Sequence, residues 1–162
     1  KGLAELENYF DVSIITQNID NLHERAGSSH VIHLHGELMN ARSTGDPSLV
    51  YPLSEDNSDI KLGDVCEKGY QLRPDIVWFG EPVPMIEEAI RISKRADIFV
   101  IIGTSMVVYP AAGLLNYVPQ GVPIYLIDPK DVATMRSDIH HIRKGASEGV
   151  KELKKLLLES EE

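Results

Sequence analysis

Short apolar runs rich in β-branched residues constrain this chain more than any other feature. Four of them span residues 12–15, 31–34, 98–102 and 123–127, and each is followed by polar residues or glycine. Such runs are typical of strands that are buried on both faces of a parallel sheet. Helical periodicity appears between the later runs, at residues 84–95 and 110–117. Strands that alternate with helices predict an α/β fold with a doubly wound parallel sheet.

The rest of the chain supplies weaker signals. We expect the tail of an amphipathic helix at residues 1–10, a short helix at 21–26 that ends at Gly27, a strand at 76–81 and a weaker strand at 140–143. The last helix is predicted to turn Val150, Leu153, Leu156 and Leu157 inward. Residues 37–73 show no periodicity and are either a long excursion or a small subdomain with a thin core.

Charge and cysteine content exclude several classes of protein. The formal net charge of −9 and the lack of a Lys/Arg cluster argue against a nucleic-acid partner. No apolar run is long enough to span a bilayer, so we expect no membrane partner. The single cysteine, Cys66, excludes an internal disulfide and a multi-cysteine zinc site. We therefore predict a cytoplasmic protein.

Polar residues follow the first two predicted strands. Gln17, Asn18 and Asp20 come after the first strand, and His35 comes after the second. Ligands of open α/β sheets bind at the carboxyl ends of strands, where amides, a carboxylate and an imidazole can orient a polar ligand and move a proton. On spacing alone an alternative stays open, in which these residues are turn formers, helix caps and a structural histidine. His33 lies on the same strand face but deeper, and we expect it to pack in the core.

The sequence motifs of these segments resemble those of one family. The sequences TQNID, LHERAG and HLHG are followed by VWFGE, GTS, VYPAAG, LIDP and KGAS. In this order they resemble the sirtuins, the NAD-dependent protein lysine deacylases, over nearly the whole chain. The chain is most similar to the bacterial branch with LRPxxVWFGE, which is grouped with deacylases of acidic acyl-lysines (desuccinylases) and of acetyl-lysine. The resemblance implies a Rossmann-like NAD-binding domain of residues 1–36 and 74–162, with 37–73 as a small subdomain.

The resemblance assigns a mechanism to His35. In the family, the acyl oxygen of the substrate lysine attacks the ribose carbon that carries nicotinamide. The histidine then helps to deprotonate a ribose hydroxyl, which attacks the resulting imidate. The products are free lysine, nicotinamide and O-acyl-ADP-ribose. Because the ordinary pKa of histidine is near neutrality, His35 is suited to be this catalytic base.

The resemblance also implies contacts with NAD. Asn18 and Asp20 match the nicotinamide pocket, where an amide and a carboxylate suit the carboxamide of the ligand, and Gln17 matches a residue that holds the ribose. The remaining positions match the loop under the adenosine and the surroundings of the adenine and its ribose; they are Gly103, Thr104, Ser105, Leu126, Ile127, Asp128 and Ala146.

A further segment matches the edge that pairs with an extended substrate peptide. It comprises Val77, Trp78, Phe79 and Gly80. Backbone pairing of this kind is β-strand addition, which depends little on the side chains of the substrate. Trp78 and Phe79 either line the acyl-lysine tunnel or are core aromatics. The implied partners are acyl-lysine proteins.

The chain departs from the family pattern in two places. Most sirtuins hold the small subdomain with four cysteines on zinc, whereas this chain has only Cys66, with Ser43 near the place of a first cysteine; we expect no metal. The family's first strand, its GAG-containing pyrophosphate loop and the residues that select acidic acyl groups are also missing from this sequence. The sheet would then be incomplete and expose an edge, which predicts a homo-oligomer. The alternative function is an incompetent, truncated NAD- or ADP-ribose-binding module.

Overall fold

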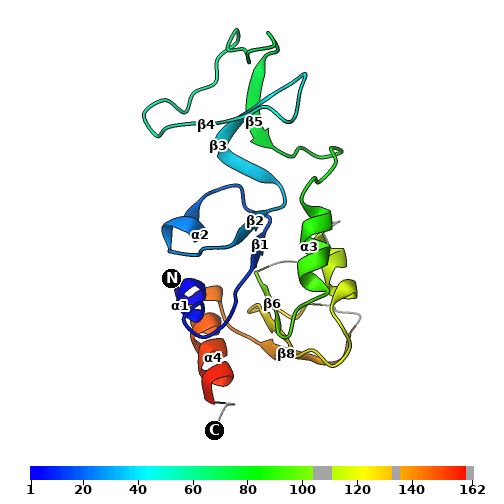
Figure 1. Cartoon of the computed structure of the whole chain (residues 1–162). Helices are drawn as coiled ribbons and strands as arrows, with labels where there is room; N and C mark the ends of the chain where they lie inside the picture. The colour runs from blue at the N-terminus through cyan, green and yellow to red at the C-terminus, as the bar shows by residue number, and fades with distance from the viewer. Residues whose placement is uncertain (104–110, 133–135, 160–162) are drawn as a thin grey trace.

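The computed structural model describes residues 1–103, 111–132 and 136–159 (Figure 1). After helix α1 (Gly2–Leu6), strands β1 (Ile14–Thr16) and β2 (Val31–His33) form a two-stranded parallel sheet. The short helix α2 (Leu22–Arg25) connects them. Gly27 follows α2 with φ of 100°, a conformation that glycine adopts without a steric cost and that ends a helix.

A second parallel sheet has the order β6–β7–β8. Its strands are β6 (Phe99–Ile102), β7 (Ile124–Ile127) and β8 (Ile139–Ile142). Ile102, Ile127 and Ile142 are in register, so the three carboxyl ends lie at one edge of this sheet. The 3₁₀ helix η1 (Ala111–Tyr117) and helix α4 (Ala146–Glu159) follow β6 and β8, respectively.

The second sheet separates two apolar cores, because successive strand residues point to opposite faces. On one face, Ile124 and Leu126 pack with Leu115 of η1. On the other face, Ile127 packs with Val150 and Leu153 of α4. Helices therefore cover both faces, as predicted for a doubly wound sheet.

One expectation for α4 is wrong. Val150 and Leu153 are buried and Leu157 is partly buried, but Leu156 is 41% exposed. The helix packs along the narrow stripe of residues 150, 153 and 157, and Leu156 lies to one side of that stripe.

A third cluster joins the two parallel sheets. Ala89 of helix α3 (Ile86–Ser93) is fully buried with Leu34, and Ile15 and Phe99 pack against the same cluster. In the part of the chain that the structure describes, β1 pairs only with β2 and β6 only with β7. The parallel α/β class is confirmed, with the parallel strands divided between two sheets.

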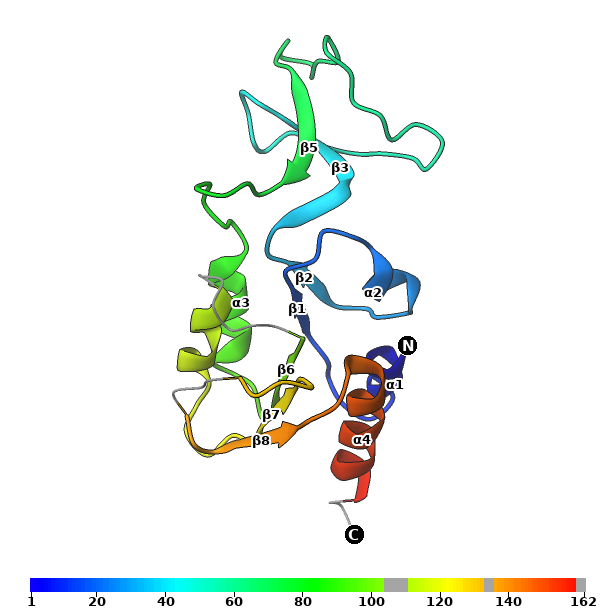
Figure 2. The same cartoon turned by 180° about the vertical axis from the view of Figure 1, so that it is seen from behind.

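Residues 36–76 contain an antiparallel sheet instead of an irregular excursion. Its order is β4 (Val50–Pro52), β3 (Gly36–Ser43) and β5 (Leu72–Ile76), and it stands apart from the parallel sheets in both views (Figures 1 and 2). The buried residues in this subdomain are small: Ala41, Ser43 and Cys66. Its core is therefore thin, as expected.

The predicted strand at residues 76–81 is wrong. The strand is β5, which ends at Ile76, and residues 77–81 form a turn closed by a hydrogen bond from the Glu81 N–H to the Trp78 carbonyl at 3.0 Å. The strand lies earlier because β5 pairs with β3. The run of apolar residues at positions 77–79 indicated a buried strand, but the side chains of Trp78 and Phe79 are exposed to solvent.

Other boundaries shift by a few residues. The first helix ends at Leu6, not at residue 10, and the segment before Tyr117 is a 3₁₀ helix from Ala111. Among the described residues, no helix combines the length and the apolar character needed to cross a membrane.

Candidate functional site

The loop after β1, residues 16–20, is attached to the chain that leads from β2 into β3. The carbonyl oxygen of Gln17 accepts a hydrogen bond from His35 Nδ1 at 3.1 Å, and that of Asn18 accepts one from His33 Nδ1 at 3.1 Å. The structure thus brings together three of the predicted site residues, Gln17, Asn18 and His35.

Backbone hydrogen bonds continue this attachment on both sides. The Leu34 N–H donates to the Thr16 carbonyl at 2.9 Å, and the Leu38 N–H donates to the Ile19 carbonyl at 2.8 Å. Four consecutive carbonyls, those of residues 16–19, therefore accept hydrogen bonds from residues 33–38. The loop and the segment that carries His35 form one unit.

The contact of His35 with Gln17 determines its tautomer. A carbonyl oxygen only accepts, so Nδ1 carries the hydrogen, and in the neutral ring Nε2 is then the acceptor. His35 is half-buried in the turn between β2 and β3. Within the described residues, Nε2 has no hydrogen-bond partner. An oriented imidazole with an available Nε2 is the arrangement that a general base requires.

Gly36 brings the small subdomain close to His35. Its φ is +79°, and a Cβ at this position would lie 2.0 Å from the Asp75 carbonyl oxygen. Only glycine fits this crossing of β3 and β5 without strain. The Val77 N–H then donates to the His35 carbonyl at 2.9 Å. The predicted substrate segment thus begins beside the predicted base.

The 77–81 turn is held by the carboxylate of Glu81. This group accepts a hydrogen bond from the Trp78 N–H at 3.0 Å and two from the Arg73 guanidinium at 2.6 and 3.1 Å. Arg42 adds a third cationic contact at 3.2 Å. The hydrogen bond from Arg73, with the Trp78 N–H and the charges of both arginines, lowers the pKa of Glu81 to about 2.

The turn presents two aromatic side chains to solvent. Trp78 is 56% exposed and Phe79 is fully exposed. The alternative that they are core aromatics is therefore wrong, since their side chains are not packed inside the molecule. The use of this segment for a peptide remains a prediction.

Asn18 and Asp20 of the 16–20 loop make local hydrogen bonds, and the Asn18 residue is exposed to solvent. Asn18 is exposed, and its N–H donates to Thr16 Oγ1 at 3.1 Å. Asp20 Oδ1 accepts from the Leu22 N–H at 3.0 Å, a turn contact directly before α2, whose N-cap residue is Asn21. The alternative that Asp20 is a turn former is thus met, and any contact with a ligand would be additional.

The remaining predicted cofactor residues lie at the carboxyl edge of the second sheet. Gly103 follows β6 with φ of 60°, and a Cβ built there would meet no atom of the described residues within 4 Å. Asp128 follows β7; its Oδ1 accepts from the Lys130 N–H at 2.8 Å, and its carbonyl accepts from His141 Nε2 at 2.9 Å. Ala146 begins α4 and is exposed.

Leu126 and Ile127 differ from these neighbours. Each is 1% exposed, and their side chains belong to the cores on opposite faces of the sheet. A ligand would therefore meet only their backbone. Thr104 and Ser105, which were predicted to lie under the adenosine, fall outside the described residues.

Sequence reasoning missed the role of His33. The residue is buried, as expected, but it makes polar contacts on both nitrogens: Nδ1 with the Asn18 carbonyl at 3.1 Å and Nε2 with Glu24 Oε1 at 2.6 Å. The sequence feature that could have indicated this role is Glu24, a glutamate in the short helix after the 16–20 loop. Its contact with His33 forms only because β1 and β2 pair side by side in the fold.

The small subdomain shows how the positions expected for zinc ligands are used. Cys66 and Ser43 are both buried, and Cys66 Sγ donates to Ser43 Oγ at 3.3 Å. The described ranges contain no group of three His, Cys, Asp or Glu side chains that could hold a metal ion. The absence of zinc remains a prediction.

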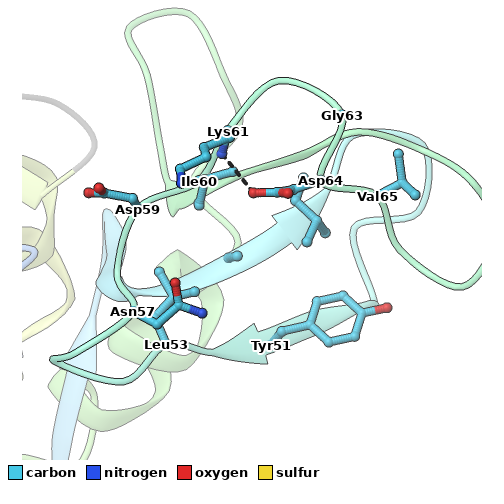
Figure 3. A pocket seen from close by; sticks show the side chains of 11 residues that line it. Tyr51, Leu53, Asn57, Asp59, Ile60, Lys61, Gly63, Asp64 and Val65 are labelled. Atoms are coloured by element: carbon cyan, nitrogen blue, oxygen red, sulfur yellow. Dashed lines mark hydrogen bonds between the residues drawn. The ribbon is translucent and has the colours of Figure 1, made fainter.

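An open cavity of about 500 Å³ lies in the same subdomain (Figure 3). Its lining is mixed, with Leu53 and Ile60 beside Asp59 and Asp64, and the Asp64 carboxylate accepts from the Lys61 N–H at 2.7 Å. None of the residues predicted to bind NAD or to catalyse lines this cavity. It is therefore separate from the candidate site around His35.

Comparisons with known proteins agree with this geometry. A sequence profile of the Sir2 family matches residues 1–110. The chain is 61% identical over 160 residues to an NAD-dependent protein deacylase of Bacteroides thetaiotaomicron, covering 96% of this chain and 68% of that protein. It is 49% identical to an NAD-dependent protein deacylase of Helicobacter pylori, covering 98% of this chain and 69% of that protein.

Solved structures give the same result. A crystal structure of a Sir2 homologue in complex with NAD superimposes with a TM-score of 0.84 at 40% identity, covering 98% of this chain and 63% of that chain. A Sir2 structure with a p53 peptide and NAD⁺ gives a TM-score of 0.74 at 32% identity, covering 98% of this chain and 68% of that one. The chain spans about two thirds of the length of these relatives. It therefore belongs to the Sir2 family, the sirtuins, whose members that it matches are NAD-dependent protein deacylases.

Proposed function

We propose that this chain has the function of an NAD-dependent protein lysine deacylase that acts on acetyl-lysine and on acidic acyl-lysines such as succinyl-lysine. The observation that carries the proposal is the His35 ring, which is oriented by Gln17 with Nε2 left as an acceptor. The 61% identity to a deacylase supports the reaction class. The LRPxxVWFGE segment, residues 72–81, supports the acyl preference by its resemblance to one bacterial branch.

The described residues fit NAD at both ends of the proposed site. At the adenosine end, Gly103 offers an open, exposed backbone, and the Asp128 carboxylate can accept from ribose hydroxyls. At the nicotinamide end, Asn18 and Asp20 supply an amide and a carboxylate for a carboxamide, which needs a donor and an acceptor. When bound, NAD supplies an electrophilic ribose carbon and nicotinamide as its leaving group.

The residues of this chain then have distinct tasks. Gln17 holds the ribose, and the His35 Nε2 accepts the proton of a ribose hydroxyl. The His35 Nδ1–H stays bonded to the Gln17 carbonyl, so the ring keeps its orientation as Nε2 gains the proton. Leu126 and Ile127 contribute backbone at the adenine, and Ala146 contributes the start of α4.

The substrate peptide would lie along residues 77–80. The Val77 N–H is already bonded to the His35 carbonyl, so peptide pairing relies on the remaining backbone groups of this turn. The exposed rings of Trp78 and Phe79 would cover the aliphatic part of the acyl-lysine. The proposed partners are therefore acyl-lysine proteins, with no nucleic acid and no membrane, in the cytoplasm.

A further parallel strand is proposed to join the two parallel sheets. Among the described strands, β1 and β6 each have a single pairing partner, and the cluster that contains Ile15 and Phe99 connects their faces. Sheet edges of this kind invite pairing by another strand. In the absence of such a strand, a second copy of the chain would pair there and produce a homo-oligomer.

The test is mass-spectrometric deacylation of acetyl- and succinyl-lysine peptides with and without NAD. It is run on this chain and on a version that carries the native upstream coding sequence, each beside His35→Ala. The matched control is His30→Ala, since His30 is an exposed histidine that bonds Ser13 Oγ at 2.9 Å outside the proposed site. We expect NAD-dependent turnover that His35→Ala abolishes and His30→Ala leaves intact.

Two outcomes would contradict the proposal. Turnover that survives His35→Ala would remove the histidine from catalysis. A lack of turnover in every version, together with an NAD-dependent rise in melting temperature, would favour the alternative of an incompetent NAD- or ADP-ribose-binding module.

A further inference from the structure

An ion pair between the buried His33 and the exposed Glu24 adjoins the 16–20 loop. His33 is 8% exposed, and its Nε2 lies 2.6 Å from Oε1 of Glu24, which belongs to α2. Its other nitrogen, Nδ1, lies 3.1 Å from the Asn18 carbonyl. The ring thus connects the helix that follows the 16–20 loop with the middle of the loop itself.

The two contacts together determine where the protons are. Nδ1 faces a carbonyl oxygen and must donate, so a neutral ring would direct the Nε2 lone pair at the Glu24 carboxylate. An imidazolium instead donates from both nitrogens, and the bond to the carboxylate is then charge-assisted. The geometry is therefore that of a protonated His33 and an ionised Glu24.

The surrounding charges support the same protonation state. Burial of the ring opposes its charge, but the hydrogen bonds to Glu24 and to the Asn18 carbonyl, with the charges of Glu24 and Glu37, raise the pKa of His33 above its ordinary value. Burial likewise opposes ionisation of Glu24, yet the hydrogen bond from His33 and the charges of His33 and His23 lower the pKa of Glu24.

We propose that Glu24 and His33 form a positioning pair that holds the 16–20 loop in the shape that binds nicotinamide. This inference rests on the proposed function, because it assigns nicotinamide to the loop. The pair touches neither NAD nor the peptide. It acts through the carbonyl of Asn18, whose own N–H is held by Thr16 Oγ1, so both sides of this residue are restrained.

The pair makes the loop sensitive to pH in one direction. Below the ordinary pKa of histidine, near 6.5, His33 is protonated and the bridge to α2 is complete. As pH rises through the raised pKa of His33, the proton on Nε2 is lost and the lone pair faces Glu24. Glu37 is the other carboxylate whose charge acts on the ring, and it favours the same protonated state. His33 then still holds the Asn18 carbonyl through Nδ1 but no longer bridges the loop to α2.

The first test is Glu24→Gln in the protein that carries its native upstream sequence. Removal of one charge-assisted bond should raise the KM for NAD about fivefold or more and shift product inhibition by nicotinamide, with the KM for the peptide within about twofold. In wild type the KM for NAD should rise above the pKa of His33, and in the variant this pH dependence should vanish. A general loss of stability would not raise the KM for NAD while leaving the KM for the peptide unchanged.

The matched control is Glu7→Gln. Glu7 also accepts hydrogen bonds, from the Ser29 N–H at 3.0 Å and from Ser29 Oγ at 2.7 Å, but it has no contact with the 16–20 loop. Its replacement should leave both KM values unchanged. If Glu24→Gln behaves like Glu7→Gln while wild type turns over, the positioning role is refuted and the proposed function stands.

The second test needs no turnover. The imidazole nitrogens of His33 are titrated by NMR, and the exchange rates of the amides at residues 17–19 are measured in wild type, Glu24→Gln and Glu7→Gln. We expect Glu24→Gln alone to lower the pKa of His33 and to speed amide exchange in the loop about fivefold. If Glu24→Gln changes neither the pKa of His33 nor the amide exchange rates at residues 17–19, or changes only one of them, the inference is overturned. A wild type without turnover would refute the proposed function separately.

Discussion

The 16–20 loop and the 77–81 turn both converge on His35, but they are held in opposite ways. In the loop, backbone carbonyls accept from imidazole rings, those of His33 and His35. In the turn, a backbone N–H donates to the Glu81 carboxylate, which two arginines surround. One segment is thus held by imidazole donors, of which His33 is paired with Glu24, and the other by a carboxylate acceptor that stays ionised.

Because of this difference, we expect the loop on the NAD side and the turn on the peptide side to respond differently to pH. The pKa of Glu81 is about 2, and arginine does not lose its proton in proteins, so the peptide-side turn keeps its shape throughout the neutral range. The loop proposed to bind nicotinamide depends on the protonation of His33. Changes near neutral pH should therefore affect the NAD side before the peptide side.

The largest expected effect comes from Gly36→Ala, which breaks both segments at once. The new Cβ would clash with the Asp75 carbonyl at 2.0 Å and strain a φ of +79°. We expect a loss of about 3 kcal/mol or more in the free energy of unfolding, measured by urea denaturation. Gly63→Ala is the control, because its φ is +100° with open space around it, and should cost about 1–2 kcal/mol. Equal losses would show that the crossing at Gly36 is not tight.

The next effect separates the two segments. Glu81→Gln weakens the contacts with Arg73 and Arg42, so the 77–81 turn should loosen and the KM for the peptide should rise about fivefold. The KM for NAD should stay within about twofold of wild type. Glu88→Gln, which removes a carboxylate paired with Arg91 on α3, is the control and should change neither value. A shift in the KM for NAD alone would reverse the assignment of the two segments.

A pH series sharpens the comparison without any substitution. Amide exchange at Asn18, corrected for intrinsic rates, should speed up as pH rises through the pKa of His33. A raised pKa contributes stability that is fully present below 6.5 and is lost as pH rises through the raised value. The Trp78 amide should stay protected at neutral pH. The pKa of Glu81 is lowered, so its contribution is present above 4.5 and is lost as pH falls toward about 2. Parallel pH profiles for the two amides would contradict this view.

The smallest effect on stability is expected for Phe79→Ala. Phe79 is fully exposed, so the free energy of unfolding should change by no more than about 0.5 kcal/mol in thermal or urea denaturation. Peptide binding, measured by calorimetry, should nonetheless weaken if the ring covers the acyl-lysine. A large loss of stability would mean that the ring is packed in the protein.

Local chemistry was enough to predict the class of fold and most of its elements. The apolar runs predicted β1, β2, β6 and β7, because a strand buried on both faces needs apolar residues at every position. The same logic predicted that Gln17, Asn18, Asp20 and His35 share one crevice, since the ends of adjacent parallel strands share one edge. The structure pairs His35 with the Gln17 carbonyl, and the shared crevice stays a prediction. The family motifs supplied the chemistry, and 61% identity to a deacylase agrees with them.

Three features were decided only by tertiary structure. The strand near the substrate segment ends at Ile76 because β5 pairs with β3, and this strand end is placed by the pairing of Ile76 with Gly36, 40 positions earlier in the chain. His33 pairs with Glu24 because α2 brings this carboxylate within 2.6 Å of Nε2, which no periodicity reveals. Leu156 is exposed because α4 is covered on one narrow stripe. Sequence patterns report what each residue needs from its own strand or helix, whereas these features depend on which distant segment arrives to meet it.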